Sequence, residues 1–367
     1  MIYNHSWIEL SRHNLVYNIT TTRKLLSPKT KLFAVVKSNA YGHGLKEIMS
    51  LSSHVVDAFC FAGTEEALYA RSLTNKQIIA LSYFATLNKQ HITNLIKNRV
   101  ELPLYSLSTL KALQNLKKPV KVHVKLDTGT SRIGFQKNEI QYLANALKSN
   151  PLIKVVGIYS HFAQAEKSKD LFTSQQLDEF KKISKDLISA LKLKDPDRHI
   201  ACSAALTKRP ETHLNAVRLG IHLYGLSGLS GGFKSLKPVL EWKTHLIQVK
   251  KVPKGTTIGY NRSYRTQKAT QIGIVPVGYA DGFPRSLSNK GYVLISGEKA
   301  PIRGIVCMNM LMVDLSNVSD AKEFDEVTLI GYSRRAYIGA DTLAKQSNTI
   351  NYEITTRINP YLHRKIV

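Results

Sequence analysis

The chain has 367 residues, more than one ordinary hydrophobic core accommodates, so two domains are expected. Apolar residues make up 43% of the chain, yet no apolar run is long enough to cross a membrane, so the composition predicts a globular protein. The net charge of +26 could attract nucleic acid or anionic ligands, but the lysines are scattered and no basic stretch alternates with aromatic residues.

The N-terminal segment and the cysteines bear on the cellular compartment. Residues 1–11 contain no basic segment followed by an apolar core, so no signal peptide is predicted. The three cysteines lie far apart and lack the spacing of metal ligands, which suits a reducing compartment. We therefore expect a cytoplasmic protein without a bound metal.

Short apolar runs alternate with stretches of helical periodicity through the first 232 residues. In one such stretch, residues 177–191, apolar side chains recur every three or four positions, and Thr64 is the predicted N-cap of another helix. Eight strand–helix alternations predict a (β/α)8 barrel, whose chemistry sits at the C-terminal ends of its strands. The predicted strands are residues 32–36, 58–62, 78–82, 102–105, 120–126, 155–159, 199–202 and 216–219.

The pattern changes near the Gly/Ser-rich segment at residues 226–233, which predicts a loop. Helical periodicity largely disappears beyond it, and apolar or alternating runs lie between Gly and Pro turns. We therefore predict a mainly β second domain over residues 233–367, after a barrel domain over residues 1–232. Its predicted strands include residues 245–252, 271–275, 292–296 and 327–330.

Lys37 directly follows the first predicted barrel strand. Burial at a strand end disfavours an ammonium ion, so the pKa of Lys37 should fall toward that of a reactive amine. A neutral amine can attack an aldehyde, which makes Lys37 a candidate Schiff-base residue. The alternative is a lysine that extends its charged end into solvent. The glycine-rich turn at residues 39–44 favours the first interpretation, because such a turn lets backbone approach a ligand.

Other strands of the predicted barrel also end on polar side chains. A barrel gathers such residues at one mouth although they are distant in sequence, whereas each one alone could be an ordinary surface residue. We expect them to converge on a single site. They are Lys37, Lys125, Asp127, Arg132, His161, Ser203 and Arg218.

The segment AVVKSNAYGHG at residues 34–44 resembles the pyridoxal-phosphate signature of the alanine racemases. The resemblance implies that Lys37 carries the cofactor and that Tyr41 helps to bind its phosphate. Similar segments continue in the same order from residues 7–14 to residues 351–357, nearly the whole chain.

Further segments of the predicted barrel resemble the same family. In KLDTGTSRIG (residues 125–134), the resemblance implies that Arg132 pairs with the substrate carboxylate; the equivalent of Lys125 is carbamylated in some members. Many relatives have Met-Gly where this chain has Thr130-Ser131. Three other segments imply contacts with the cofactor. His161 would line it, Ser203 and the backbone of Gly220 and Ile221 would meet its phosphate, and Arg218 would lie at its pyridine nitrogen.

An arginine at the pyridine nitrogen has a mechanistic consequence. Arginine does not give up its proton, so Arg218 would leave the ring nitrogen unprotonated. A fully delocalised carbanion is then disfavoured, which limits side reactions such as transamination.

The resemblance also assigns residues of the predicted second domain. Tyr260 lies nineteen residues before the tyrosine of GYADG, Tyr279, and this interval implies that Tyr260 is the second catalytic base. Tyr279 and Met308 would contact substrate, while Asn309 stands where an aspartate is common. Family members are homodimers in which the second domain of one subunit completes the other's site, so Tyr260 would act across the interface.

The resemblance therefore implies a pyridoxal-phosphate alanine racemase with a two-base mechanism using Lys37 and Tyr260, and the family's role implies a supply of D-alanine for peptidoglycan. A serine or broad-specificity racemase would share every motif. A non-enzymatic pyridoxal-phosphate carrier is a second alternative, although such proteins lack the domain that supplies Tyr260. A basic nucleic-acid binder is a third, which salt-dependent retention of DNA would test.

Overall fold

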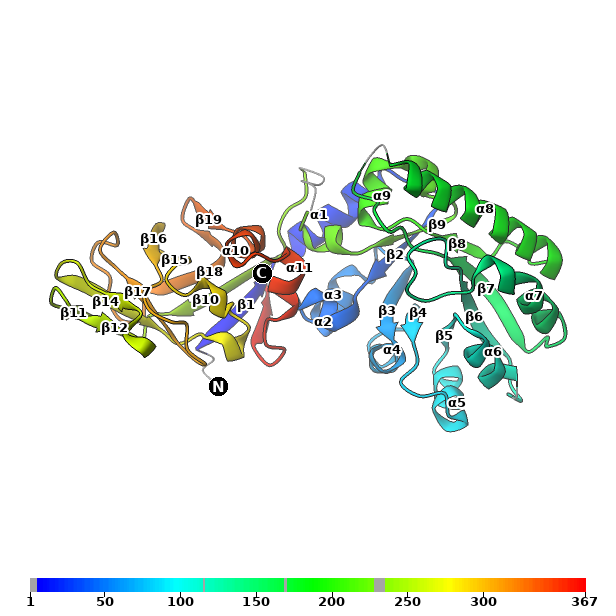
Figure 1. The fold of residues 1–367 in the computed structure, drawn as a ribbon, viewed down its shortest axis with the longest axis horizontal. Helices are drawn as coiled ribbons and strands as arrows, with labels where there is room; N and C mark the ends of the chain where they lie inside the picture. The colour runs from blue at the N-terminus through cyan, green and yellow to red at the C-terminus, as the bar shows by residue number, and fades with distance from the viewer. Residues whose placement is uncertain (1–4, 115, 168–169, 228–234) are drawn as a thin grey trace.

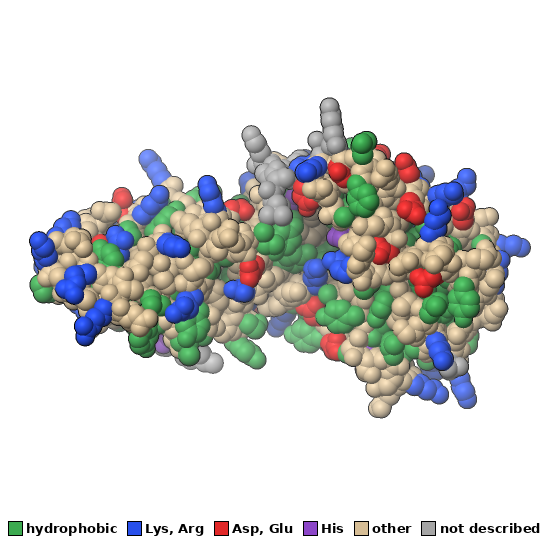
Figure 2. All heavy atoms as spheres, viewed as in Figure 1, with side chains coloured by type: hydrophobic (Ala, Val, Ile, Leu, Met, Phe, Trp, Pro, Cys, Tyr) green, Lys and Arg blue, Asp and Glu red, His purple; other side chains and the backbone are tan. Residues whose placement is uncertain are grey.

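The computed structural model describes residues 5–114, 116–167, 170–227 and 235–367, which form two domains side by side (Figure 1). The predicted domain boundary at residues 232/233 and most of the predicted loop at residues 226–233 lie outside the described residues. On the face shown in Figure 2, Lys and Arg side chains are spread over both domains. The described residues include no helix that is long and apolar enough to span a membrane.

The first domain is a nearly closed barrel of eight parallel strands, as predicted. Their spatial order is β8-β7-β6-β5-β4-β3-β2-β9, and the Arg218 N–H closes the ring by donating to the Ala201 carbonyl at 3.1 Å. Seven of these strands carry Val, Ile, Leu, Ala or Phe buried by their neighbours, whereas the short β8 (Asp197–His199) buries Asp197 and His199 instead. The strands are β2 (Lys31–Val35), β3 (Ala58–Gly63), β4 (Gln77–Tyr83), β5 (Val100–Leu104), β6 (Val120–Lys125), β7 (Ile153–Tyr159), β8 (Asp197–His199) and β9 (Ala216–Leu219).

Helices surround the barrel on its outside (Figure 1). The predicted apolar stripe lies on α8, where Leu177, Phe180, Ile183 and Leu187 are buried. The Thr64 prediction was wrong by one residue, because Gly63 is the N-cap and the Thr64 hydroxyl instead bonds the His91 ring at 2.9 Å. The helices are α1 (Arg12–Arg23), α2 (Lys37–Tyr41), α3 (Leu45–Ser52), α4 (Thr64–Arg71), α5 (Lys89–Lys97), α6 (Leu107–Gln114), α7 (Ile140–Lys148), α8 (Leu171–Leu191) and α9 (Ser203–Lys208).

The second domain is mainly β, as predicted, and is built on a seven-stranded sheet. Strand β1 (Ser6–Leu10) comes from the N-terminus and lies second from one edge of this sheet, between β10 and the edge strand β20. Residues 6–10 therefore join this sheet, although the sequence prediction placed them with the barrel. The other strands are β10 (Leu240–His245), β15 (Tyr292–Ile295), β16 (Glu298–Pro301), β18 (Glu326–Ser333), β19 (Ala336–Ile338) and β20 (His363–Ile366).

A three-stranded sheet and a two-stranded ribbon complete this domain. The single strand predicted over residues 245–252 was wrong, since the chain leaves the large sheet at His245 and starts β11 in the smaller one. Buried Leu246 lies at the break. The strands are β11 (Gln248–Val252), β14 (Thr270–Val275) and β17 (Leu311–Asp314) in the smaller sheet, and β12 (Thr257–Ile258) and β13 (Tyr264–Arg265) in the ribbon.

Two C-terminal helices, α10 (Ala340–Ser347) and α11 (Asn351–Thr356), lie between the domains (Figure 1). Helix α11 contacts α2 of the barrel. In addition, the Arg364 guanidinium donates to the Gly42 carbonyl at 2.9 Å. The second domain therefore packs directly against the turn that carries Lys37.

Candidate active site at the barrel mouth

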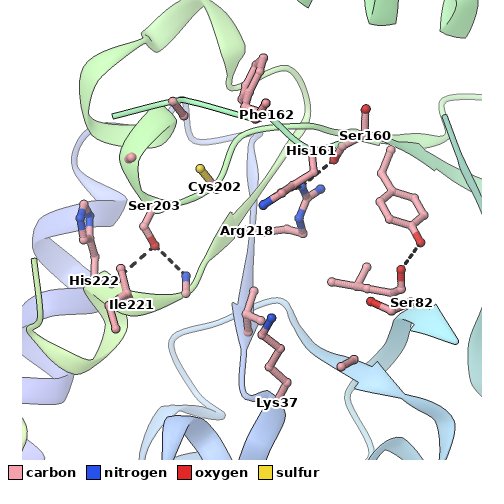
Figure 3. Close-up of a pocket in the computed structure, with 18 of the residues that line it drawn as sticks. Lys37, Ser82, Ser160, His161, Phe162, Cys202, Ser203, Arg218, Ile221 and His222 are labelled. Atoms are coloured by element: carbon pink, nitrogen blue, oxygen red, sulfur yellow. Dashed lines mark hydrogen bonds between the residues drawn. The ribbon is translucent and has the colours of Figure 1, made fainter. Parts of the chain in front are cut away.

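A cavity of about 290 Å³ opens at the C-terminal ends of the barrel strands. Figure 3 shows Lys37 extending into it from one side, with Arg218, His161 and Ser203 on the opposite wall. The expected convergence of strand-end side chains is thus present, although Asp127 does not line the cavity. The predicted residues that line it are Lys37, Tyr41, Lys125, Arg132, His161, Ser203, Arg218, Gly220 and Ile221.

Lys37 and Tyr41 are held by a left-handed turn. Residues 38–41 all have φ between 52° and 55°, a conformation that costs an L-residue about 1–2 kcal/mol each. Two hydrogen bonds from Asn39 hold the turn: its N–H donates to Glu66 Oε1 and its side-chain oxygen accepts from the Leu45 N–H, each at 2.8 Å. The backbone strain of residues 38–41 therefore lies directly beside Lys37, at the edge of the cavity.

Burial affects the protonation of Lys37 and Lys125, two of the lysines that line the cavity. Desolvation and the positive charge of Arg132 lower the pKa of Lys37, while Glu66 partly opposes this shift. The direction predicted from the sequence is confirmed. Burial and Arg218 lower the pKa of Lys125 to about 7, so much of that amine is neutral near neutral pH.

A small polar cradle lies between α9 and the end of β9. Ser203 Oγ accepts a hydrogen bond from the Gly220 N–H at 2.8 Å. A Cβ atom on Gly220 would lie 3.0 Å from the Tyr41 hydroxyl and 3.6 Å from Ser203 Oγ, so both hydroxyls face the space above this glycine. Two hydroxyls beside bare backbone form a site suited to an anion such as phosphate.

Arg218 is buried in the wall of the cavity and fixed on several sides. Its guanidinium donates to the carbonyls of His199 at 2.8 Å, Ser160 at 2.7 Å and Ile200 at 3.1 Å. It also contacts Nδ1 of His199 at 2.6 Å and Nδ1 of His161 at 3.2 Å. Burial and the adjacent guanidinium of Arg218 lower the pKa of His161 well below its ordinary value, so that this ring is neutral.

Exposed Arg132 reaches the cavity from the loop after β6. Asp127 Oδ1 accepts hydrogen bonds from the backbone N–H groups of Gly129, Thr130 and Ser131 at 3.0–3.1 Å. Ser131 adopts a φ of 53°, a conformation more usual for glycine. The Thr130-Ser131 sequence is thus accommodated in a tight loop, and Asp127 acts on that loop rather than in the cavity.

The predicted residues of the second domain are not brought to this cavity within one chain. Tyr260 and Met308 line a second cavity of about 790 Å³ and are 70% and 55% exposed. Tyr279 lies close to Met308, because its N–H donates to the Cys307 carbonyl at 3.0 Å. Figure 1 places β12, which precedes Tyr260, far from α2 and the barrel mouth. The structure therefore forms two groups of predicted site residues.

Sequence reasoning missed three contributors to the barrel-mouth site. Tyr352 of α11 lines the cavity and packs against the Tyr41 ring at 6.0 Å between centroids. Glu66 anchors the strained turn, and the Tyr159 hydroxyl donates to the Leu81 carbonyl in the cavity wall. Tyr352 lay within a quoted family segment, so that resemblance was a usable signal. Glu66 follows the predicted N-cap Thr64 by two residues, and that position gave no signal of a contact with the turn.

Three fully buried histidines near this site predict acid sensitivity. Burial lowers the pKa of His43 to about 3 and of His222 to about 4, and that of His199 well below 6.5. The unfolded chain would bind these protons near pH 6.5, so stability is present above that pH and is lost below it. The free energy of unfolding should fall by about 1.4 kcal/mol per histidine between about pH 7.5 and 5.5.

Urea unfolding at several pH values measures this slope. In a folded His43→Phe variant, the dependence of the free energy of unfolding on pH should weaken by about the contribution of one histidine. Replacing the exposed His54 with glutamine should leave that dependence unchanged. An unaltered slope in His43→Phe would contradict the assignment of a neutral buried ring.

The fold and the cavity define a class of proteins in which a (β/α)8 barrel presents a lysine amine of lowered pKa at its mouth and a β domain is attached. The family profile described as "Alanine racemase, N-terminal domain" matches residues 10–228, and "Alanine racemase, C-terminal domain" matches residues 239–366. The chain belongs to the alanine racemase family, whose members are isomerases.

Individual relatives match over almost their full length. The alanine racemase of Halothermothrix orenii is 37% identical over 372 residues, covering 98% of this chain and 96% of that protein. The structure of alanine racemase from Clostridium difficile has a TM-score of 0.92 at 33% identity and covers 100% of this chain and 97% of that one. The alanine racemase of Bartonella henselae, "with covalently bound pyridoxal phosphate", has a TM-score of 0.87 at 27% identity and covers 99% of both chains.

Proposed function

We propose that this protein is a pyridoxal-phosphate-dependent alanine racemase that acts as a homodimer with shared active sites. The observation that carries the proposal is Lys37, an amine of lowered pKa that extends into the barrel-mouth cavity opposite Arg218. Membership of the family supports the reaction. The D-alanine formed would serve peptidoglycan synthesis, and the free Cys60, Cys202 and Cys307 agree with a cytoplasmic place of action.

The residues of the cavity fit pyridoxal phosphate. Tyr41, Ser203 and the backbone at Gly220 and Ile221 would hold its phosphate in the cradle that a Cβ atom at position 220 would fill. Lys37 would bond its aldehyde carbon, and Arg218 would face its pyridine nitrogen. When bound, the cofactor supplies an electron-withdrawing ring that weakens the α-C–H bond of an amino acid attached to it.

The chain's own side chains would orient the amino acid and move protons. Arg132 lines the cavity and would pair with the substrate carboxylate. Lys37 Nζ would remove or return the α-proton on one face of the α-carbon. Inversion also needs a proton donor on the opposite face, which a single amine cannot easily reach.

We assign that second role to Tyr260 of a second copy of the chain. The 70% exposure of Tyr260 and its distance from the barrel mouth leave it available to a partner. Met308 lines the same cavity and Tyr279 lies beside it, so a partner's barrel would meet all three together. In this proposal the barrel, within residues 1–232, holds the cofactor, and the β domain, within residues 233–367, supplies the second base and substrate contacts.

Chemical trapping tests the assignment of Lys37. Borohydride reduction of the cofactor-loaded enzyme should fix the cofactor permanently, and peptide mapping should find the label on Lys37. A label on Lys125, the other cavity lysine of lowered pKa, would reject the assignment. Parallel turnover of L-alanine and L-serine would decide whether alanine is the preferred substrate.

A further inference from the structure

A line of four buried side chains runs through the barrel from Arg218 toward the opposite end. Nδ1 of His199 on β8 lies 2.6 Å from the Arg218 guanidinium, and His199 Nε2 lies 3.0 Å from Nδ1 of His123 on β6. His123 Nε2 lies 2.8 Å from the carboxylate of Glu101 on β5. These four residues are at most 6% exposed.

The chemistry of the two ends fixes the direction of every hydrogen bond in this line. A guanidinium only donates, so Nδ1 of His199 must accept. Since a neutral imidazole carries one N–H, His199 must donate from Nε2, and His123 must accept at Nδ1 and donate from Nε2. The last acceptor is Glu101. Both rings are therefore held as Nε2–H tautomers between a fixed cation and a fixed anion.

The surrounding packing is built around this line. The Tyr159 ring stacks on His199, with 5.0 Å between ring centroids and 4° between planes. Gly157 leaves room for the other histidine, because a Cβ atom there would lie 2.0 Å from His123 Nδ1. At the far end, Gln77 donates to Glu101 at 2.7 Å, and the Lys121 ammonium lies 3.5 Å from it.

Glu101 remains an anion in this buried position. Burial alone would raise the pKa of its carboxyl group, but the hydrogen bonds from His123 and Gln77 hold it below the ordinary value. A buried carboxylate is costly without partners, so these bonds keep a negative charge inside the barrel and in line with Arg218.

We propose that Glu101 and His123 are positioning residues that act through His199 to fix the orientation of Arg218. The anion at the far end keeps Nδ1 of His199 unprotonated and directed at the guanidinium. The part of the inference that concerns the cofactor ring rests on the proposed function. The part that concerns the histidine tautomers depends on the protein alone.

Nitrogen-15 spectra of histidine-labelled protein test the tautomers with and without pyridoxal phosphate. Wild type should show His123 and His199 as neutral Nε2–H rings. The variant Glu101→Leu/His123→Leu removes both members of one pair, so no buried charge is left alone, and His199 should then populate both tautomers. Glu101→Gln keeps the shape and provides the same comparison if the leucine pair does not fold, since its amide can offer either oxygen or NH₂ to His123.

A second measurement follows the transamination of alanine by the enzyme with bound pyridoxal phosphate. This side reaction releases pyruvate. The amount of pyruvate formed per racemisation event should rise about tenfold in Glu101→Leu/His123→Leu, the size of effect seen when a metal-bound histidine loses the partner that orients it. His123→Gln should restore both readouts, because its amide accepts and donates in the same direction. Asp197→Asn is the matched control: Asp197 is also buried and paired, to Lys31 at 2.6 Å, but lies outside the line.

The inference would be overturned if the nitrogen-15 signals of His199 were unchanged in folded Glu101→Leu/His123→Leu. If only Glu101→Gln folds, unchanged signals in that variant would overturn it. An unchanged pyruvate ratio together with altered tautomers would overturn its cofactor part. Failure of the proposed function is distinguishable, because pyridoxal phosphate would then leave Lys37 unlabelled while the tautomers in cofactor-free protein stay as expected.

Discussion

Replacing Lys37 with arginine is expected to abolish racemisation in both directions. The guanidinium keeps a cation at the end of β2 but does not give up its proton, so it can neither attack an aldehyde nor accept an α-proton. Loss of a general base alone typically costs about 10²–10⁴-fold in rate, and losing the covalent attachment adds to this. The measurements are turnover of L- and D-alanine and the absorption of bound cofactor.

Two comparisons separate chemistry from folding in this experiment. The exposed Lys46, on the neighbouring helix α3, offers a matched Lys46→Arg control that should keep full activity. A small primary amine added to Lys37→Ala should restore part of the turnover, because it can replace the missing base. Full activity in Lys37→Arg would rule out Lys37 as the reacting lysine.

Replacing Tyr260 with phenylalanine is expected to stop proton exchange for one enantiomer only. The change retains the ring at the edge of the second cavity but removes its ionisable oxygen, so folding and cofactor loading should survive. If Tyr260 serves L-alanine and Lys37 serves D-alanine, exchange of the α-proton with deuterated solvent should fail for L-alanine. It should persist for D-alanine with retained configuration. The rate loss should again be about 10²–10⁴-fold.

Mixing two inactive variants tests whether Tyr260 acts on a partner. In a heterodimer of Tyr260→Phe and Lys37→Ala, shared sites would place both lesions in one site and neither in the other. With about half of the dimers mixed, activity should return to roughly a quarter of wild type per site, by subunit counting for a two-fold dimer. Heterodimers that form but stay inactive would show that Tyr260 does not act across an interface.

Much of the barrel was predictable because its strands are short and buried on both faces. Residues 32–36 and 58–62 have nothing but apolar side chains, so their periodicity left little choice of structure. The apolar run alone left open a Lys37 that extends into solvent, and the glycine-rich turn at residues 39–44 favoured a lysine at a ligand site. The convergence with Arg218 then follows from the topology of a parallel barrel.

Other features depend on contacts between distant segments, which local patterns do not encode. Of residues 38–41 only Asn39 readily adopts a left-handed conformation, so the sequence does not predict four such residues in a row; Glu66 and the β domain hold them there. His123 and His199 lie 76 positions apart, and only the strand order brings their rings together. The break after β10 likewise reflects the burial of Leu246 between two sheets rather than a turn signal.

The position of β1 in the large sheet has a consequence for how the chain can be divided and folded. Ile8 pairs with Trp242 on one side and Arg364 on the other, so β1 can join the sheet only after residues more than 200 positions later in the chain have been made. During synthesis β1 remains an unpaired apolar strand while the entire barrel emerges, and contacts of such long sequence separation form slowly. A fragment that starts near residue 233 would lack this strand, which would leave β10 as an open edge and β20 without a partner strand. The β domain should therefore aggregate when expressed alone, and a permuted chain with β1 fused after β20 by a flexible linker should rescue its solubility.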